Sequence, residues 1–313
     1  MTLIPVETPE DFALAQQFII PHEETCVSLA SLVRRKSEKL VFLVNSENTV
    51  VEPVETTGAT GILGLLSLDS TIYHCLPDIT KIDRNDLIKN LPYLIKKPVR
   101  CISGETGATE FLIEILSSVN YGFDTADAEH PLTQPPCPPL LIKYPYKMMR
   151  WTGSFDSAHG PVAEQSRSTG SGGEEIIRCT EHDMETLHDL QKDYMKDEVA
   201  VPGRKLTDAE VDITLRQILK NQLCFALTVD GDLVAKANTN AIGINCVQIG
   251  GVYTHPLYRR NGYAGSLVQA LCNRAVRAHK QPVLFVKEKN TPAFNLYQKL
   301  GFEECGRYMI AYY

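Results

Sequence analysis

The sequence contains 313 residues, 43% of them hydrophobic and 22% charged, a composition typical of a globular protein long enough for two domains. Its formal net charge of −7, without a lysine- and arginine-rich arm, argues against a nucleic-acid partner. No run of roughly 20 apolar residues offers a membrane-spanning helix, so no membrane association is expected.

The N-terminus and the cysteines indicate a cytoplasmic protein. Residues 1–7 (MTLIPVE) have neither a basic region nor an apolar core, so they are not expected to act as a secretory signal. The nine cysteines are scattered along the chain and form no Cys-x-x-Cys pair, which predicts reduced thiols. For the same reason, no metal site is expected.

The first half of the chain predicts an α/β domain over residues 1–151. Thr8-Pro9-Glu10-Asp11 is typical of a helix start, with an N-cap residue, a proline in the first turn and acidic residues after it. Pro92 is expected to end or kink the helix around it. The other predicted elements are helices at 23–36, 86–95 and 107–119, and strands at 40–44, 61–68, 71–76, 99–103 and 140–149.

A segment rich in glycine and serine, residues 152–175, predicts a linker or a mobile loop. The second domain is placed at 176–313. Its predicted elements are a strand at 176–179, helices at 180–196 and from the capping box at 207–210, a hairpin at 225–241, a strand at 245–254, a helix after Gly262, a strand at 282–286, a helix at 291–300 and a final segment at 307–313.

The elements follow one another in the same order in both halves. This order is compatible with a duplicated domain and equally with an unrelated α/β domain preceding the second half. In the first half, Gly104-Glu105-Thr106-Gly107 opens a helix after a strand, but Glu105 would repel a phosphate. The region after Leu76 also lacks the glycine that a second phosphate loop would need. We therefore expect residues 1–151 to bind no cofactor and to have a structural or substrate-shaping role.

The stretch 252–264 (VYTHPLYRRNGYA) carries the main functional signal. A strand pattern ends at Pro256, a turn follows, and an amphipathic helix is predicted to begin near Gly262. A helix N-terminus presents free backbone N–H groups and the positive end of a dipole, and both favour a phosphate. Arg259 and Arg260 add positive charge. The alternative interpretation is an ordinary capped surface turn.

The pattern Arg259-x-x-Gly262-x-Ala264 resembles the acyl-CoA pyrophosphate loop of the GNAT family of N-acetyltransferases. The resemblance covers roughly 176–313 and implies an α/β (α+β) fold, with a mixed, mostly antiparallel sheet flanked by helices. In that family the sheet opens beside its fourth strand, where acetyl-CoA inserts, and Gly250-Gly251 is the expected bulge. The implied cofactor-binding residues are Val252, Tyr253, Thr254, Arg259, Arg260, Asn261, Gly262, Tyr263, Ala264, Gly265, Asn290 and Asn295.

Residues 290–302 resemble a second motif of the same family, in which an Asn-x-x-Ala-x-x-Leu-Tyr helix ends in Gly-Phe. Asn290 is suited to cap this helix, and Gly301 to end it. In many relatives a tyrosine at the position of Tyr297 protonates the departing thiolate. A phenol, with a pKa of about 10, holds its proton at neutral pH and can donate it in the transition state. A packing role for Tyr297 is the alternative.

The general base is not identified by the sequence. Some relatives carry a glutamate on the fourth strand, but the strand at 245–250 has none. Asp197 and Glu198 lie where the family often builds its acceptor pocket. His255 adjoins the loop but also precedes a proline, which favours a structural role. Deprotonation through water would need no dedicated residue.

Together these patterns predict one acetyl-CoA site per chain and an N-acetyltransferase. An amine of a small molecule or peptide would attack the thioester directly, while a backbone N–H of the fourth strand polarises its carbonyl. Two alternatives stay open: a non-catalytic acyl-CoA-binding or regulatory protein, and an acyltransferase that uses another acyl-CoA. The sequence does not specify the acceptor amine, and it is compatible with a homodimer.

Overall fold

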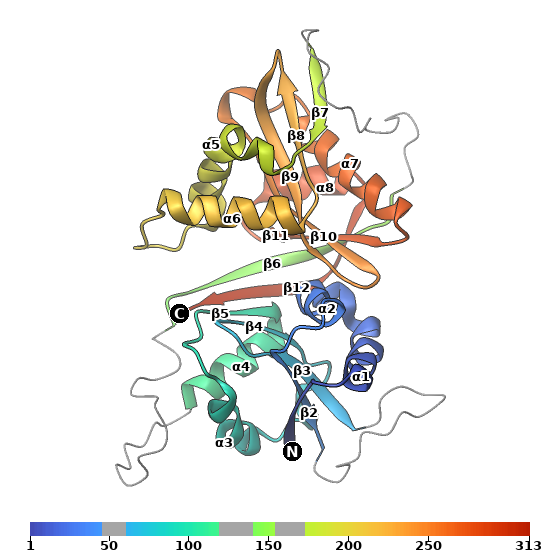
Figure 1. Ribbon diagram of the computed structural model, residues 1–313, viewed down its shortest axis with the longest axis vertical. Helices are drawn as coiled ribbons and strands as arrows, with labels where there is room; N and C mark the ends of the chain where they lie inside the picture. Colours follow the sequence, from blue (N-terminus) through green and yellow to red (C-terminus); the bar gives the residue numbers. More distant parts are fainter. Residues whose placement is uncertain (46–60, 119–139, 154–172) are drawn as a thin grey trace. The chain divides into compact units, whose positions relative to one another are not determined.

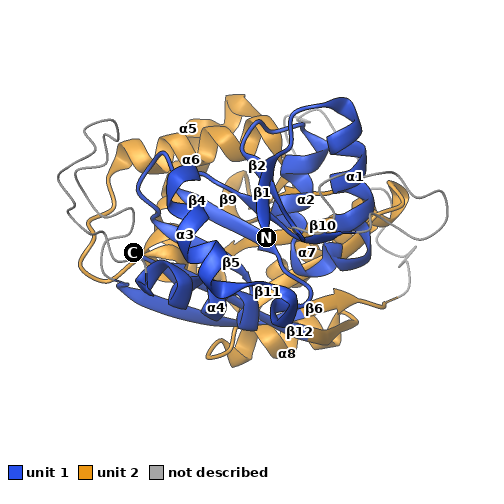
Figure 2. Cartoon of the chain, turned by 90° about the horizontal axis from the view of Figure 1, so that it is seen from below, with its two compact units in different colours: residues 1–148, 306–313 blue, residues 149–305 orange. Residues whose placement is uncertain are grey.

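The computed structural model describes residues 1–45, 61–118, 140–153 and 173–313. They form two compact units, unit 1 (Met1–Met148 and Gly306–Tyr313) and unit 2 (Met149–Cys305), shown in Figure 2. Both boundaries fall inside strands, β6 (Ile142–Trp151) and β12 (Phe302–Tyr312). The division differs from the predicted ranges at the C-terminus, because residues 306–313 group with unit 1. Residues 154–172 of the predicted linker lie outside the described residues.

Figure 1 shows the strands and helices of unit 1. Its elements are β1 (Thr2–Pro5), α1 (Pro9–Ile19), a 3-10 segment (Ile20–Thr25), α2 (Val27–Arg34), β2 (Leu40–Val44), β3 (Ile62–Ser67), β4 (Thr71–Cys75), a 3-10 turn (Ile79–Lys81), α3 (Arg84–Leu94), β5 (Cys101–Glu105), α4 (Thr106–Ser118) and the first part of β6. Strand β1 was not predicted from the sequence. The helix predicted at 23–36 is confirmed only over Val27–Arg34.

Two local details show how the sequence sets the helices of unit 1. Thr8 caps α1 as predicted: its hydroxyl accepts from the Asp11 N–H, and the Asp11 carboxylate accepts from the Thr8 N–H at 2.8 Å. Pro92 lies inside α3, which continues to Leu94. The N–H that Pro92 lacks would have served the last turn of the helix, so the helix ends shortly after the proline and not at it.

The sheet of unit 1 is antiparallel except at one pair of strands. The order runs β1-β2-β3-β4-β5, and β4 pairs with β5 in parallel. The neighbour of β5 on its other side is the C-terminal strand: residues 308–312 of β12 pair with 101–105 in antiparallel register. Apolar side chains of α3 and α4 pack on this sheet and bury, among others, Ile72, Leu91 and Ile102.

Unit 2 repeats this order of elements (Figure 1). Its elements are β7 (Glu174–Arg178), a 3-10 turn (Glu181–Asp183), α5 (Met184–Tyr194), a π-helical segment (Met195–Val199), α6 (Asp208–Asn221), β8 (Cys224–Val229), β9 (Asp232–Ile242), β10 (Cys246–Thr254), a 3-10 turn (Pro256–Tyr258), α7 (Tyr263–Arg277), β11 (Gln281–Lys287) and α8 (Thr291–Lys299). The strand order β7-β8-β9-β10-β11 is again antiparallel except for the parallel pair β10–β11. The mixed α/β fold class is confirmed.

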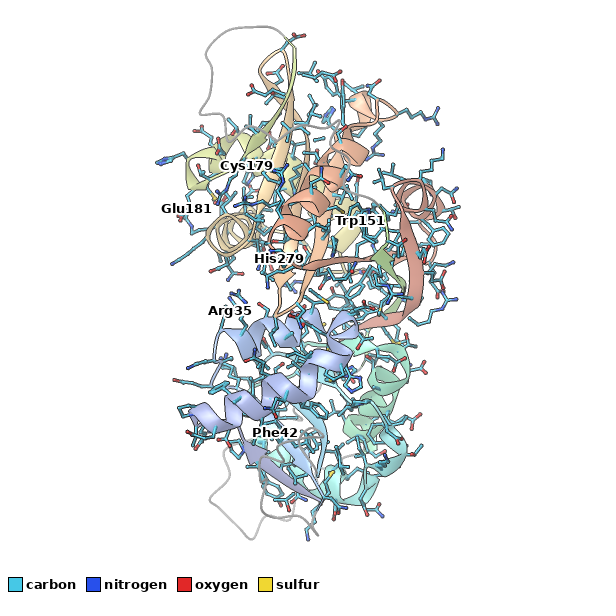
Figure 3. All side chains as sticks on the ribbon, turned by 90° about the vertical axis from the view of Figure 1, so that its right-hand side faces the viewer. Arg35, Phe42, Trp151, Cys179, Glu181 and His279 are labelled. Carbon is cyan, nitrogen blue, oxygen red and sulfur yellow. The ribbon has the colours of Figure 1, made fainter. Side chains whose placement is uncertain are left out.

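The two faces of the unit 2 sheet bury different clusters. One cluster includes Leu267 and Leu271 of α7 and the β9 residues Ala235 and Ala237. The other lies beneath α5 and α6 and includes Leu187, Leu215 and Cys179. Of these residues, Cys179 is labelled in Figure 3. Because successive side chains of a strand point to opposite faces, Lys236, between Ala235 and Ala237, lies on the α5 side, next to Tyr194.

Candidate functional site

The strands β10 and β11 separate halfway along their length. Their parallel register runs from the pair Cys246–Gln281 to the pair Ile249–Leu284. Beyond Ile249, the register of β10 with β11 ends although β11 continues to Lys287, and β10 stays in register with β9. The register with β9 also shifts between Gly250 and Tyr253, which is the bulge expected at Gly250-Gly251. Within the described ranges, this part of β10 therefore has an edge that faces no paired strand.

The two glycines of the bulge make room for side chains of β9. Gly251 has a φ of 59°, and a Cβ atom there would lie 1.8 Å from Oδ1 of Asn238. A Cβ atom on Gly250 would lie 2.1 Å from Nδ2 of Asn240. The amides of Asn238 and Asn240 are hydrogen-bonded to one another at 3.1 Å. Larger residues at either glycine would push this polar layer away.

Lys236 belongs to the same layer, and the sequence interpretation missed it. It is fully buried, donates from Nζ to the carbonyl of Gly251 at 2.9 Å and to Oδ1 of Asn238 at 3.1 Å, and lies 4.9 Å from the centroid of the Tyr194 ring. Burial lowers the pKa of Lys236. The signal that could have revealed it is the alternation Lys236-x-Asn238-x-Asn240 beside a Gly-Gly pair, since polar residues on one face of a central strand need partners.

The loop after β10 leads to a helix N-terminus without a side-chain cap. Gly262 is the N-cap of α7, has a φ of 83° and offers no side chain to accept hydrogen bonds from the first turn. A Cβ atom there would meet nothing within 4 Å, so the glycine is needed for its conformation and not for space. Tyr263 is buried, and its hydroxyl donates to Glu174 at 2.7 Å.

Arg259, which was expected beside a phosphate, turns back toward the strand. Its Nε donates to the carbonyl of Thr254 at 3.1 Å, and its guanidinium lies 5.5 Å from the centroid of the Tyr253 ring. Nη2 is 3.6 Å from the carboxylate of Asp197, to which the Tyr253 hydroxyl also donates, at 3.2 Å. Arg260 and Asn261 are exposed, and the Asn261 amide donates to the carbonyl of Tyr258 at 3.2 Å.

The π-helical segment Met195–Val199 brings acidic groups to the end of β10 and β11. Lys287, the last residue of β11, lies 3.5 Å from the Glu198 carboxylate and also donates to its backbone carbonyl. Glu198 is close enough to Tyr194 and Tyr297 to contribute to raising the pKa of both, although burial is the main cause. The pKa of Tyr194 rises to about 12, and that of Tyr297 is also raised. Both phenols therefore keep their protons at neutral pH.

The remaining predicted residues have simpler surroundings. Asn290 caps α8, with Oδ1 accepting from the N–H of Ala293 at 3.2 Å, as expected. Asn295 is exposed on the same helix, and Gly265 packs against Leu296. On β10, Val252 is half-buried and lies in the bulge, and the buried hydroxyl of Thr254 has no hydrogen-bond partner among the described residues.

The corresponding place in unit 1 is filled by a side chain. The register of β4 with β5 ends at Tyr73–Ser103, and next to it the ring of His74 lies against Gly104, where a Cβ atom would be 2.2 Å from Nε2. Nε2 is 2.8 Å from the hydroxyl of Thr109, and burial lowers the pKa of His74 to about 3. At the start of α4, the Glu105 carboxylate already accepts from the Ala108 N–H at 2.9 Å.

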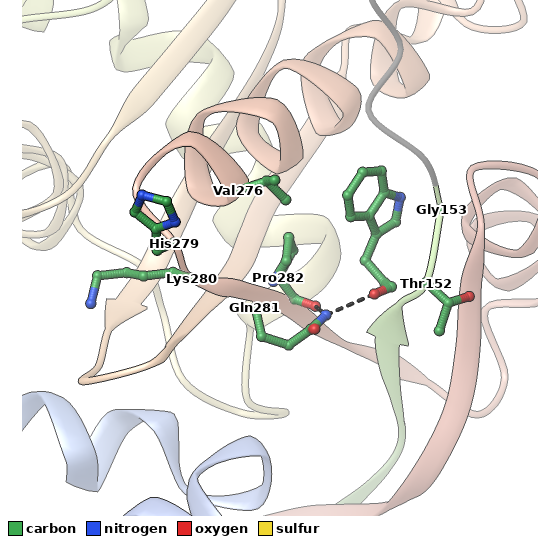
Figure 4. A pocket seen from close by; sticks show the side chains of 8 residues that line it. Thr152, Gly153, Val276, His279, Lys280, Gln281 and Pro282 are labelled. Carbon is green, nitrogen blue, oxygen red and sulfur yellow. Dashed lines mark hydrogen bonds between the residues drawn. The ribbon is translucent and has the colours of Figure 1, made fainter.

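A cavity of about 510 Å³ lies at the opposite end of β11 from this site (Figure 4). It is lined by Val276, His279, Lys280, Gln281 and residues 151–153, and the Gln281 amide donates to the carbonyl of Trp151 at 2.7 Å.

Among the described residues, no three His, Cys, Asp or Glu side chains gather as a metal would require. None of the helices in the described ranges has the length and apolar character needed to cross a bilayer.

Comparison with known proteins supports the assignment of the fold. The model of a protein family described as "FR47-like protein" matches residues 229–310, from the end of β8 into β12. A Drosophila protein of known structure aligns with 99% of this chain and 98% of its own, at 12% identity and a TM-score of 0.59. A GNAT-family acetyltransferase from Colwellia psychrerythraea aligns with 100% of this chain and 99% of its own, at 9% identity and a TM-score of 0.51. At such identities the likeness shows the fold alone, and the chain has a two-domain GNAT-like fold.

A third structure, a GNAT-family protein from Novosphingobium aromaticivorans, aligns with 55% of this chain at 19% identity and a TM-score of 0.40. The alignment covers 65% of the length of that protein. No curated protein sequence matches the chain.

Proposed function

We propose that this chain, whose fold is GNAT-like and whose residues 229–310 match the FR47-like family, is an acetyl-CoA-dependent N-acetyltransferase. The observation that carries the proposal is the divergence of β10 from β11 beside the N-terminus of α7, which has no side-chain cap. An unpaired strand edge can accept the amides of an extended ligand, and a free helix N-terminus can accept its phosphates. Acyl-CoA carries both groups.

The proposed donor site uses backbone groups more than side chains. The N–H groups of Tyr263, Ala264 and Gly265 receive the pyrophosphate, and the exposed Arg260 adds positive charge. The edge of β10 at 252–254 pairs with the pantetheine amides. Asn261, Asn290 and Asn295 border this site as polar contacts. No metal takes part in the proposed reaction.

The proposed chemistry is direct transfer. The amine nitrogen attacks the thioester carbonyl, the new C–N bond forms and the C–S bond breaks, with a proton leaving the amine and a proton joining the thiolate. Tyr297 gives its proton to the thiolate, because its raised pKa keeps the phenol protonated until that negative charge develops. Glu198 takes the proton of the amine, directly or through water, and Lys287 holds the Glu198 carboxylate in place.

The acceptor is proposed to be a primary amine on a small molecule or a peptide. Unit 1 is proposed to bind no acyl-CoA, because His74 fills the place that corresponds to the opening in unit 2. The competing function is an acyl-CoA-binding protein without transferase activity. The competing function predicts a different outcome, namely that acyl-CoA binds tightly but that no amine causes release of the CoA thiol.

The test is thiol release from acetyl-CoA, followed colorimetrically, with panels of small amines and peptides. The wild-type protein should release CoA with at least one class of amine, and Tyr297→Phe should lower kcat by roughly 10²-fold or more while acetyl-CoA still binds. Tyr308→Phe, which removes a buried phenol from unit 1, is the control for the loss of a phenol outside the proposed site. Unchanged turnover in Tyr297→Phe would remove the acid role, and binding without turnover in the wild-type protein would favour the competing function.

A further inference from the structure

A buried lysine is hydrogen-bonded to the backbone of the bulge in β10. Lys236 lies on β9, has no exposed surface, and its Nζ bonds to the carbonyl of Gly251 and to the amide oxygen of Asn238. The Tyr194 ring lies near the same ammonium group. Of the residues that the structure describes, none offers Lys236 a carboxylate; the ionisable groups that influence its pKa are the thiols of Cys224 and Cys179.

Burying an ammonium group without a carboxylate is costly, so its hydrogen bonds must be well formed. Lys236 has three N–H donors, and they meet one carbonyl, one amide oxygen and one aromatic face. The cation is therefore satisfied where it is, and any displacement of the Gly251 carbonyl would leave one of its donors unpaired. The bond from Lys236 therefore holds the Gly251 carbonyl in place.

The direction of that carbonyl fixes the direction of another group. In a trans peptide, the C=O of one residue and the N–H of the next lie in one plane and point in opposite directions. The carbonyl of Gly251 points to Lys236, so the N–H of Val252 points away from it. On β9, Asn238 is in register with Gly250 and Lys236 with Tyr253, which leaves Gly251 and Val252 without a register partner on that strand.

We propose that Lys236 is a positioning residue, which holds the Gly251 peptide so that the N–H of Val252 donates to the thioester oxygen of the acyl donor. The inference rests on the proposed function and adds to it the residue that orients the oxyanion-stabilising donor. A preorganised donor of this kind is worth more in the transition state than in the ground state, because negative charge on the oxygen grows as the amine attacks. Lys236 itself touches neither the donor nor the acceptor.

The direct test is infrared difference spectroscopy of acetyl-CoA labelled with ¹³C at the thioester carbonyl. In the wild-type protein, the labelled C=O band should shift to lower frequency on binding, as a hydrogen-bonded carbonyl does. In Lys236→Met the acetyl-CoA should still bind, but most of that shift should be lost, and kcat should fall about tenfold or more with KM for acetyl-CoA changed less than about threefold. Lys236→Arg, which keeps the charge, should restore part of the shift.

The matched control is Lys280→Met. Lys280 also donates to backbone carbonyls, those of Gly243 and Ile244, at the other end of β10 and β11, and its loss should leave the band shift as in the wild type. A full shift and full kcat in Lys236→Met would overturn the inference alone. Absence of acetyl-CoA binding to the wild-type protein would overturn the proposed function and this inference with it. If Lys236→Met does not fold, the same measurement on Lys236→Gln decides, with the same expected loss.

Discussion

The guanidinium of Arg259 lies 3.6 Å from the carboxylate of Asp197, so one of the two positive charges in the loop before α7 is already partly neutralised. We expect Asp197→Asn to free Arg259 and to remove a negative charge from beside the proposed pyrophosphate site. Both groups are about half exposed, so the gain should be modest, roughly two- to fivefold in acetyl-CoA affinity at low salt. Titration calorimetry at two ionic strengths measures the change in acetyl-CoA affinity. Asp189→Asn, which also removes one negative charge but does not touch Arg259, is the control. Weaker binding in Asp197→Asn would contradict this role.

Two glycines with positive φ should respond differently to alanine. At Gly262 a Cβ atom meets nothing, so Gly262→Ala should cost only the backbone strain, about 1–2 kcal/mol of unfolding free energy. At Gly251 a Cβ atom would lie 1.8 Å from Oδ1 of Asn238, so Gly251→Ala adds a steric clash to the strain and should cost more. Urea denaturation compares the two variants. Equal losses would mean that the layer on β9 moves aside freely.

His74 should make unit 1 sensitive to acid. Burial lowers its pKa from 6.5 to about 3 in the folded protein, so between these values the unfolded chain binds more protons than the folded one. The contribution of neutral His74 to the free energy of unfolding is complete above about pH 6.5. It is lost as the pH falls toward 3, at about 1.4 kcal/mol per pH unit. His74→Gln should remove this loss, amounting to roughly 2 kcal/mol between pH 6.5 and 5, in urea denaturation at both pH values.

The control for this experiment is His182→Gln, which replaces an exposed histidine. It should keep the wild-type dependence on pH. An unchanged acid dependence in His74→Gln would show that other groups account for it.

Glu198 is the carboxylate proposed to take the proton of the amine. Glu198→Gln keeps the shape of the side chain but cannot accept a proton, so kcat should fall by roughly 10²-fold while acetyl-CoA affinity stays within about twofold. Steady-state kinetics with the best amine of the panel measures it, and Glu185→Gln on α5 is the control. If kcat is unaffected, the amine loses its proton without this carboxylate.

Much of the fold of unit 2 could be predicted because local chemistry determined it. The capping box at Thr207 and the start of a helix at Gly262 each depend on residues next to one another in the chain, and both are confirmed. The bulge at Gly250-Gly251 followed from a resemblance and not from local residues.

Contacts between distant segments could not be predicted in the same way. The placement of β12 beside β5 joins residues far apart in sequence, and no local pattern indicates which strand will occupy the free edge of β5. Lys236 was overlooked because a lysine in a hairpin usually points to solvent. Its burial depends on Tyr194 from α5 and on a backbone carbonyl of β10.

The central claim is that acyl-CoA binds where β10 leaves β11, beside the start of α7. Amide chemical-shift mapping of the ¹⁵N-labelled protein with acetyl-CoA tests it most directly, because the proposed contacts are backbone N–H groups. We predict saturable shifts concentrated at 250–254 and 262–265, with none at 104–109 of unit 1. No saturable shift at millimolar acetyl-CoA, or shifts confined to unit 1, would contradict the claim.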